Sequence, residues 1–401
     1  MNNKTQTRLI LYFIGLIFMA CQKTMPASPD ENSLLDGHID GLYNEEQRQF
    51  LSGDAGFAET FSTSNGLGPT FVATSCISCH SGDGKGHPFT SLVRFGQDAP
   101  GINTFLNQGG PQLQNRSIPG YQPEKTPANA SFSTFLPPAV TGLGFLDAVS
   151  DADLMVLEDS LDTNGDGISG KANWINVQDY VQLRPNAIAH PIFPNRYIGR
   201  VGKKAAAYDL LVQTVNAYNQ DMGITSVFEP IDAYTGLEVE PDIDINTVRD
   251  VVFYLKTLKK PLRRDKEDAN VVLGEQLFQQ IDCAKCHIPT MTTSSSSIAA
   301  LSNKTFHPYT DLLLHDMGAG LDDNYTEGNA ETAEWKTPAL WGLGLSKDAQ
   351  GGSYFLLHDG RATSIESAIE MHGGEAQNSA NLFSALSQED KTRLIKFLES
   401  L

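Results

Sequence analysis

The clearest hydrophobic patterns in the chain predict four amphipathic helices arranged in two similar sets. One set begins with Glu45 to about Phe61 and closes with Asn246–Leu258, whose apolar residues fall on one face. The other begins with Val271–Gln280 and closes with Ser387–Leu401, where Ser387 is a suitable N-cap. The pattern therefore predicts a mainly α-helical protein.

A short motif follows the first helix of each set. A C-x-x-C-H run is the attachment signature of a c-type haem, in which both thiols bond to the porphyrin and the histidine binds the iron. A zinc ribbon or a disulfide framework would not require a histidine directly after the second cysteine both times. The sequence therefore predicts two covalent haem c groups, attached at Cys76, Cys79 and His80 and at Cys283, Cys286 and His287.

The repeated order of helix, haem motif and closing helix favours two haem domains over one larger domain. A basic, turn-forming segment at residues 259–265 separates the two sets. We therefore predict an N-terminal haem domain with a loop insertion over residues 37–262 and a C-terminal haem domain over residues 263–401. Residues 81–145 are rich in Gly, Pro, Asn and Gln, and we expect them to wrap the first haem as ordered loops.

The N-terminal stretch has the composition of an export signal. Basic residues precede an apolar run from Leu9 to Ala20, which is too short to span a bilayer. The residues before Cys21 resemble a lipoprotein signal, and an ordinary secretory signal is the alternative. We predict a signal peptide over residues 1–21 and a polar tether over residues 22–36. The protein is then periplasmic or bound to the cell envelope, and it meets the membrane only through a lipid at Cys21.

Net charge limits the partners. A formal charge of −19 at pH 7 argues against nucleic acid, since phosphate contacts need a basic surface. It permits steering of a basic redox partner and is also usual for a solvated surface.

One acidic loop is a candidate calcium site. Asp162, Asn164 and Asp166 alternate with small residues before Gly167, as at the start of an EF-hand loop. The twelfth position is Asn173 instead of a bidentate glutamate, which argues against a true EF-hand. A simpler calcium loop and an Asx-rich turn held by its own side chains both remain open.

Long motifs in the second half resemble those of bacterial di-haem oxidoreductases of the peroxidase type. These motifs are residues 307–318, 334–344, 355–361 and 368–376. The resemblance covers nearly the whole mature chain. A more remote similarity, to di-haem cytochrome c peroxidases and to the di-haem enzyme of methylamine utilisation, is confined to the haem motifs and short blocks. It implies two cytochrome c-like domains, with long ordered loops and the haems near their interface.

The remote group also implies a distal ligand for the second haem. Its His-Asn/Asp-x-Gly, Lys-x-Pro-x-Leu and His-Asp-Gly blocks fall here at His315, Lys336 with Pro338, and His358. The group's distal ligand is the fifth residue of a block beginning Ala-Val or Ala-Ile, which is His372 here. Alternatively, His372 caps a helix, or the neighbouring Met371 is the ligand. His315 and His358 are expected to bond haem propionates or to order the backbone.

In the same group a peroxide pocket lies beside the first haem. A tryptophan lies between the haems, and a glutamine and a glutamate line the pocket. Here Lys203 stands at the tryptophan position, Gln213 follows ten residues later, and Asp221 stands near the glutamate position. A carboxylate there could move a proton between peroxide oxygens. Alternatively, Gln213 and Asp221 lie on the polar face of a plain helix. Lysine cannot act as an oxidisable aromatic relay.

Together these features predict a di-haem c-type cytochrome oxidoreductase. A redox donor of the envelope would reduce the haem bound by His287 and His372, and electrons would pass to the His80 haem, where hydrogen peroxide or a similar small oxidant is reduced. The alternatives are a non-catalytic electron-transfer cytochrome, a protein-modifying di-haem oxidant and a sensor partner of another envelope protein. An open sixth position on the first haem would distinguish an enzyme from a carrier.

Overall fold

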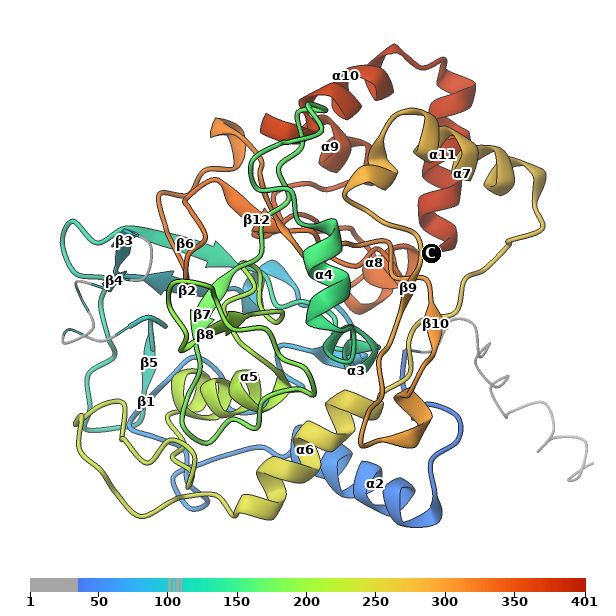
Figure 1. The fold of residues 1–401 in the computed structure, drawn as a ribbon. Helices are drawn as coiled ribbons and strands as arrows, with labels where there is room; N and C mark the ends of the chain where they lie inside the picture. The colour runs from blue at the N-terminus through green and yellow to red at the C-terminus, as the bar shows by residue number, and fades with distance from the viewer. Residues whose placement is uncertain (1–34, 100–101, 104, 106–107, 109) are drawn as a thin grey trace, which may run out of the picture. The chain divides into compact units, whose positions relative to one another are not determined.

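The computed structural model describes residues 35–99, 102–103, 105, 108 and 110–401 (Figure 1). The expected signal peptide, Cys21 and the tether as far as residue 34 lie outside the described residues. Residues Leu35–Leu401 form one unit in their backbone contacts, and the division at residue 262 stays a prediction. None of the helices in the described ranges is long and apolar enough to cross a membrane.

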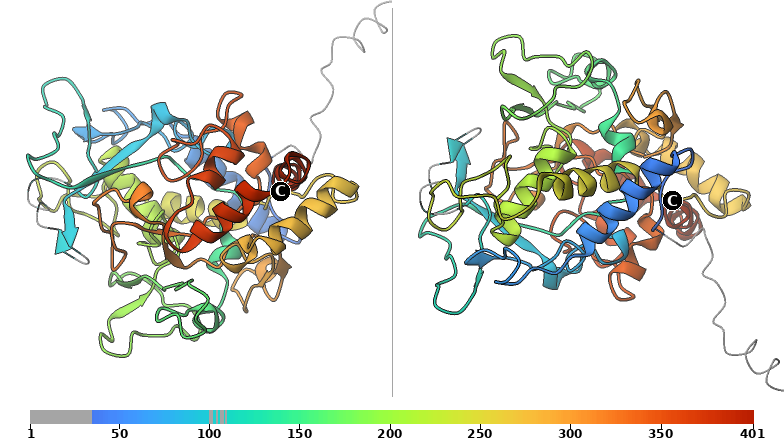
Figure 2. Two further views of the ribbon diagram at one scale, coloured as in Figure 1. Left: turned by 90° about the horizontal axis from the view of Figure 1, so that it is seen from above. Right: turned by 90° about the horizontal axis from the view of Figure 1, so that it is seen from below.

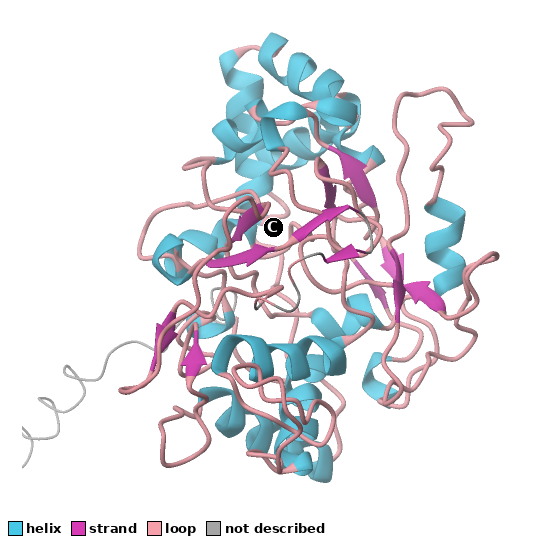
Figure 3. Cartoon of the chain, turned by 90° about the vertical axis from the view of Figure 1, so that its left-hand side faces the viewer, coloured by secondary structure: helices cyan, strands magenta, loops and turns pink. Residues whose placement is uncertain are grey.

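Helix is the predominant regular structure in the described residues, and the strands are short. Figure 3 shows most of the helices in two groups, with strands, loops and a few separate helices between them. The strands form six antiparallel pairs of two strands each. The pairs are β1 (Thr70–Phe71) with β5 (Arg116–Ser117), β2 (Leu92–Phe95) with β6 (Phe132–Phe135), β3 (Gln97–Ala99) with β4 (Ile102–Asn103), β7 (Trp174–Asn176) with β8 (Arg196–Ile198), β9 (Met291–Thr292) with β10 (Thr305–Phe306), and β11 (Leu314–Asp316) with β12 (Glu334–Lys336).

All four amphipathic helices predicted from the sequence are present. They are α2 (Asn44–Ala58), α6 (Ile245–Thr257), α7 (Ala269–Gln280) and α11 (Gln388–Ser400). Ser387 caps α11 as expected, because its hydroxyl accepts a hydrogen bond from the N–H of Asp390 at 3.2 Å. The remaining helices are α3 (Leu143–Asp147), α4 (Asp151–Leu157), α5 (Leu210–Asn216), α8 (Ser346–Ala349), α9 (Ile365–Glu370) and α10 (Gln377–Ala385).

The two sets of helices pack in the same way. α2 lies against α6, and α7 lies against α11, as Figures 1 and 2 show. Glycine permits the close approach in both pairs. A Cβ atom at Gly53 of α2 would lie 2.0 Å from the carbonyl oxygen of Asp250, and one at Gly274 of α7 would lie 2.1 Å from that of Arg393. Any larger residue at either position would force the helices apart.

A short turn of matching sequence closes each helix pair. Residues 138–144 read Pro-Ala-Val-Thr-Gly-Leu-Gly, and residues 338–344 read Pro-Ala-Leu-Trp-Gly-Leu-Gly. The N–H of Gly142 donates to the carbonyl of Leu258 at 3.3 Å, and that of Gly342 donates to Leu401 at 2.8 Å. Each turn therefore packs on the end of its own closing helix. This repeat was not predicted from the sequence, although it is visible in the chain.

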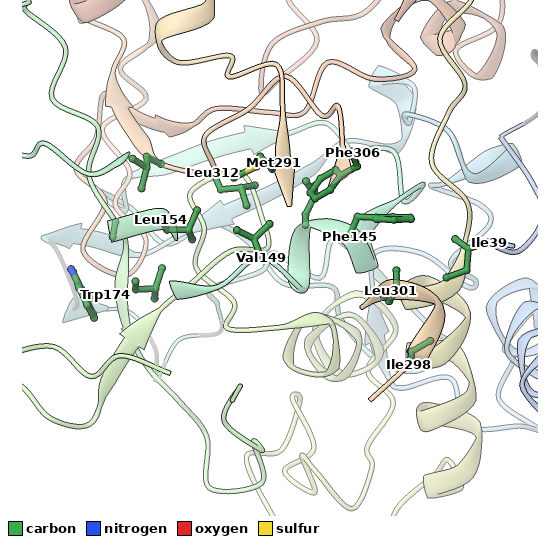
Figure 4. Packing of buried hydrophobic residues seen from close by; sticks show 14 of the residues in the cluster. Ile39, Phe145, Val149, Leu154, Trp174, Met291, Ile298, Leu301, Phe306 and Leu312 are labelled. Atoms are coloured by element: carbon green, nitrogen blue, oxygen red, sulfur yellow. The ribbon is translucent and has the colours of Figure 1, made fainter. Parts of the chain in front are cut away.

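The largest buried apolar cluster joins the two halves of the chain. It combines side chains near α3, such as Phe145, with side chains from β9 and β10, such as Phe306 (Figure 4). The rings of Phe145 and Phe306 lie 5.5 Å apart between centroids. Residues on both sides of position 262 thus share one core.

Candidate functional site

The first haem motif follows α2 and presents two free thiols and one neutral imidazole. Burial raises the pKa of Cys76 to about 12, and the negative charge of Asp221 adds to this effect. The Nδ1 atom of His80 lies 2.8 Å from the carbonyl oxygen of Pro138. A carbonyl only accepts, so Nδ1 carries the proton and Nε2 keeps its lone pair. Burial lowers the pKa of His80 to about 4, which keeps the ring neutral and able to bind a metal.

The second haem motif has the same arrangement. Its histidine, His287, has Nδ1 3.0 Å from the carbonyl oxygen of Tyr309, and burial lowers the pKa of His287 to about 4. The hydroxyl of Tyr309 donates to Glu275 at 2.9 Å, and Arg263 donates two hydrogen bonds to the same carboxylate at 3.1 and 2.8 Å. These contacts hold the carbonyl that orients His287 and leave Nε2 free.

His372 shares a cavity with His287. Both rings line a cavity of about 330 Å³ together with Cys283 and Cys286. The ring of His372 places Nδ1 2.7 Å from the carbonyl of Ala368 in α9, so it caps that helix while its Nε2 stays free. Burial is the main cause of the low pKa of His287, and the charge of His372 contributes as well, which shows that the two rings are near each other.

The side chain of Met371, the alternative ligand, is 40% exposed, whereas that of His372 lines the cavity.

His315 is held by protein carboxylates. Its Nε2 lies 2.8 Å from Asp311, and its Nδ1 lies 2.7 Å from Glu375. Burial alone would lower the pKa of His315, but hydrogen bonds with Asp311, Cys286 and Glu375 outweigh it and raise the pKa to about 12. Both ring nitrogens are therefore engaged, and the ring is a buried cation beside the second haem motif. The pairing with Glu375 could not be predicted from local sequence, because Glu375 lies 60 residues away.

His358 stacks on an aromatic ring of the cavity wall. Its ring lies parallel to that of Trp335, with centroids 3.8 Å apart, and its Nε2 lies 2.8 Å from Asp323. The ammonium of Lys204 also lies over the indole of Trp335, 3.9 Å from the ring centroid. This aromatic part of the wall was not identified from the sequence.

Asp221 lies close to the first haem motif. It ends a π-helical segment, Ala217–Asp221, that continues α5. Burial raises the pKa of Asp221 to about 7, and the positive charge of Arg94 limits the rise. The charge of Asp221 in turn raises the pKa values of Cys76 and Cys79 further, after burial. A half-buried carboxylate that can both take up and release a proton near neutral pH is thus placed beside the motif.

Gln213 has a less defined position. It lies half-buried on α5, and no hydrogen bond within the described ranges engages its side chain. The structure therefore brings Asp221 to the first haem motif without showing that Gln213 joins it. Sequence spacing alone could not show which of Gln213 and Asp221 lies beside the motif, because both were assigned through the same short block of the remote group.

Three lysines line the cavity that His287 and His372 share. They are Lys85, Lys203 and Lys336. Burial lowers the pKa of Lys203 well below its usual range, and the charges of Lys85 and Lys336 lower it further. The charge of Lys203 also contributes to the low pKa of His80, after burial. The lysine at the expected tryptophan position thus lies within electrostatic range of the first haem motif and on the wall of the second.

The acidic loop is held by its own side chains. Asp162 accepts from the N–H of Gly167 at 3.2 Å, and Asn164 accepts from the N–H of Asp166 at 2.8 Å. The ammonium of Lys285, within the second haem motif, lies 3.3 Å from the carboxylate of Asp166. The loop is therefore an Asx-rich turn anchored to that motif. Calcium binding by its oxygen atoms stays a prediction.

Comparison with known proteins assigns the chain to a family. Residues 135–401 match the family model described as "Di-haem oxidoreductase, putative peroxidase". The chain belongs to the di-haem oxidoreductase family. Membership implies haem cofactors, and the resemblance inferred from the sequence motifs is confirmed. No curated protein matches the chain.

Two solved structures show similarity to the di-haem oxidoreductase. A chain of hydrazine synthase from Kuenenia stuttgartiensis is 14% identical, with a TM-score of 0.41 and 94% of each chain covered. A MauG-like protein associated with microbial copper homeostasis is 15% identical, with a TM-score of 0.32, 64% of this chain and 90% of that chain covered.

The residues present suit haem. Each motif offers two free thiols and an imidazole whose Nδ1 is fixed by a backbone carbonyl. The cavity beside the second motif has mostly apolar walls, with Phe278, Leu340 and Leu356 among its lining residues. Apolar walls, fixed imidazoles and basic side chains together match a porphyrin with an iron centre and anionic edge groups.

Proposed function

We propose that this di-haem oxidoreductase reduces hydrogen peroxide with electrons from a redox donor of the cell envelope. One difference between the two motifs supports this most strongly. His372 lines the cavity of the second motif together with His287 and keeps its Nε2 free, whereas the contacts of the His80 ring in the described ranges are with Pro138 and Phe57 and include no second histidine. The second iron would then be held by two imidazoles, and the first would keep a position for peroxide.

Both haems are proposed to be covalent haem c groups. Cys76 and Cys79 would bond one porphyrin, with His80 as the iron ligand, and the second motif would hold the other in the same way. The matching order of helix, motif, glycine turn and closing helix supports two cytochrome c-like halves. Export as a lipoprotein anchored at Cys21 remains part of the proposal, as do a periplasmic or envelope location and a calcium ion at the acidic loop.

Haem iron supplies the one-electron chemistry and the site where peroxide binds. The protein must supply proton movement, because reduction of hydrogen peroxide to two water molecules consumes two electrons and two protons. Asp221 is suited to this role, since a pKa of about 7 leaves it partly ionised at neutral pH. Its ionised form can take a proton from the attacking oxygen, and its protonated form can return it to the leaving oxygen. Arg94 would stabilise the charged form between these events.

His372 would keep the second haem closed. A ring fixed through Nδ1 to Ala368 directs its free nitrogen at one position and cannot easily swing away. Two imidazole ligands favour a low-spin iron that exchanges electrons without binding substrate. The second haem is therefore proposed to receive electrons from the donor and pass them to the first.

The test is an EPR and optical spectrum of the oxidised and half-reduced protein, with and without peroxide. The proposal requires one low-spin haem that peroxide leaves unchanged and one haem whose sixth position is free or displaceable. It also requires the pre-reduced protein to be oxidised by peroxide. Two saturated low-spin haems and no reaction would leave an electron-transfer cytochrome. Oxidising equivalents that persist and then disappear on addition of a protein substrate would favour a protein-modifying oxidant.

A further inference from the structure

The three lysines on the cavity wall form a connected row. The backbone N–H of Lys336 donates to the carbonyl of Lys203 at 3.0 Å, so the two residues are neighbours although they lie far apart in sequence. Lys85 is followed by Gly86, whose N–H donates to the carbonyl of Pro137 at 2.9 Å. The adjacent Pro138 carbonyl is the group that His80 bonds. The row therefore runs from the first haem motif to the wall of the second.

These lysines have no partner in the part of the chain that the structure describes. No hydrogen bond or ion pair engages the ammonium group of Lys85, Lys203 or Lys336 there. The contrast with Lys204 is clear, because its ammonium donates to three backbone carbonyls, those of Glu331, Thr332 and Glu334, at 2.8, 3.0 and 2.7 Å. All three hydrogen bonds of the Lys204 ammonium are thus taken up by the protein, whereas those of the three cavity lysines are not.

The surroundings of the three lysines favour binding of an anion. Burial lowers the pKa of Lys85 and of Lys336 to about 8 and that of Lys203 well below its usual range. The carboxylates of Asp311 and Asp359 lie near enough to act on Lys336 and Lys203, but Asp311 already bonds His315 at 2.8 Å and Asp359 already bonds Arg361 at 2.6 Å. Three ammonium groups in one enclosed space are costly unless negative charge enters with the ligand.

Haem brings such charge. A haem attached through its vinyl groups keeps both propionate carboxylates, so two haems carry four. We propose that Lys85, Lys203 and Lys336 bind propionate carboxylates, with Lys203 between the two cofactors, and that they thereby raise the reduction potentials of both haems. This inference rests on the proposed haem attachment at both motifs and goes beyond it by naming the residues that set the potentials.

The effect on potential follows from charge. Reduction of ferric haem adds one negative charge, which a nearby ammonium stabilises, and an ammonium that pairs with a propionate also cancels the charge opposing reduction. Removing the lysine charge therefore favours the oxidised state. Since Lys203 lies next to Lys336 and within electrostatic range of His80, its loss is expected to affect both haems.

The experiment is a spectroelectrochemical titration of the holoprotein without peroxide. Lys203→Met keeps most of the side-chain volume and removes the charge. We expect its reduction equilibrium to shift at least tenfold toward the oxidised form at both haems, which is 59 mV for a one-electron couple. Lys203→Arg keeps the charge and should stay within threefold of the wild type. Lys304→Met removes the same charge from an exposed position and should produce no shift.

Several results would overturn the inference. Unchanged potentials in Lys203→Met would remove the lysine from the propionates, and a shift at one haem alone would remove it from between the cofactors. An equal shift in Lys304→Met would show an effect of net charge only. Potentials that change with phosphate concentration in the wild type would show that a free anion occupies the lysines.

A second variant protects the test against failure to fold. If Lys203→Met does not accumulate with two haems, Lys85→Met should lower the potential of the second haem, whose cavity Lys85 lines, and no change there would contradict the inference. Because potentials are read without peroxide, the two proposals fail separately. A protein with shifted potentials that ignores peroxide would refute only the peroxidase function, and an active peroxidase with unchanged potentials would refute only the lysine role.

Discussion

Replacing Asp221 by asparagine isolates proton transfer from all other features of the first haem site. The substitution keeps the size of the side chain and its contacts and removes the ionisable group. Loss of a positioned acid–base group lowers turnover by about 10² to 10⁴-fold, so peroxide reduction in Asp221→Asn should fall into that range while both haems remain bound. The pH profile should change as well. Wild-type turnover should lose activity below about pH 7, where Asp221 becomes protonated, and the variant should lack this limb.

The same carboxylate makes a prediction about stability. Asp221 has a pKa of about 7 in the fold and 3.8 in an unfolded chain, and this difference corresponds to about 4 kcal/mol. The folded state then binds the proton more tightly than the unfolded state does. The contribution of Asp221 to the free energy of unfolding should therefore be highest below pH 3.8. It should fall by about 4 kcal/mol as the pH rises to about 7. Asp221→Asn should lack this part of the pH dependence in denaturant titrations at several pH values.

Asp83 provides the matched control. It is a second aspartate near the first haem motif, and burial raises its pKa to about 6, but its carboxylate accepts a hydrogen bond from Tyr254 at 2.6 Å. Asp83→Asn should leave peroxide turnover within a few-fold of the wild type. If Asp221→Asn retains turnover within threefold with both haems attached, or if both variants lose it equally, the acid–base role of Asp221 is wrong.

Three further outcomes are expected. A pyridine haemochrome assay should give two c-type haems per chain, and replacing both cysteines of either motif with alanine should remove one; a wild-type count of one, or bound zinc, would contradict the haem assignment. His372→Ala should convert the low-spin EPR signal of the second haem to high spin and leave the first unchanged, whereas an unaltered spectrum would exclude His372 as the ligand. Chelator treatment should lower the melting temperature if the acidic loop binds calcium, and no shift together with no calcium by elemental analysis would leave the plain turn.

Helix positions followed from the sequence because local patterns determine them. The apolar faces and capping residues of α6 and α11 set their bounds to within about a residue. The helix α2 was predicted to reach Phe61 but ends at Ala58, since Glu59 leaves the helical region at ψ 134°. The N–H of Phe61 donates to the carbonyl of Thr74 at 2.8 Å, a contact that no local sequence pattern predicts.

The site was predictable only where it rests on short motifs. The two C-x-x-C-H runs predict haem attachment by themselves, and His372 was predicted through the family resemblance. The remaining wall of the cavity depends on contacts between distant segments. Lys336 meets Lys203, and Glu375 meets His315, through folding that joins residues 60 or more apart. Individual lysines and acids look like ordinary surface charges until the fold brings them together.

The matching glycine turns bear on the ancestry of the chain. Two halves with the same order of helix, cysteine motif, turn and closing helix are most simply explained by duplication of an ancestor with one such motif. The copies have since become interdependent at the turn itself. Position 141 is threonine, whereas its counterpart is Trp341, and a Cβ atom at Gly142 would lie 2.7 Å from the indole ring of Trp341. A change at Gly142 therefore requires a change at Trp341, so the two turns have to evolve together.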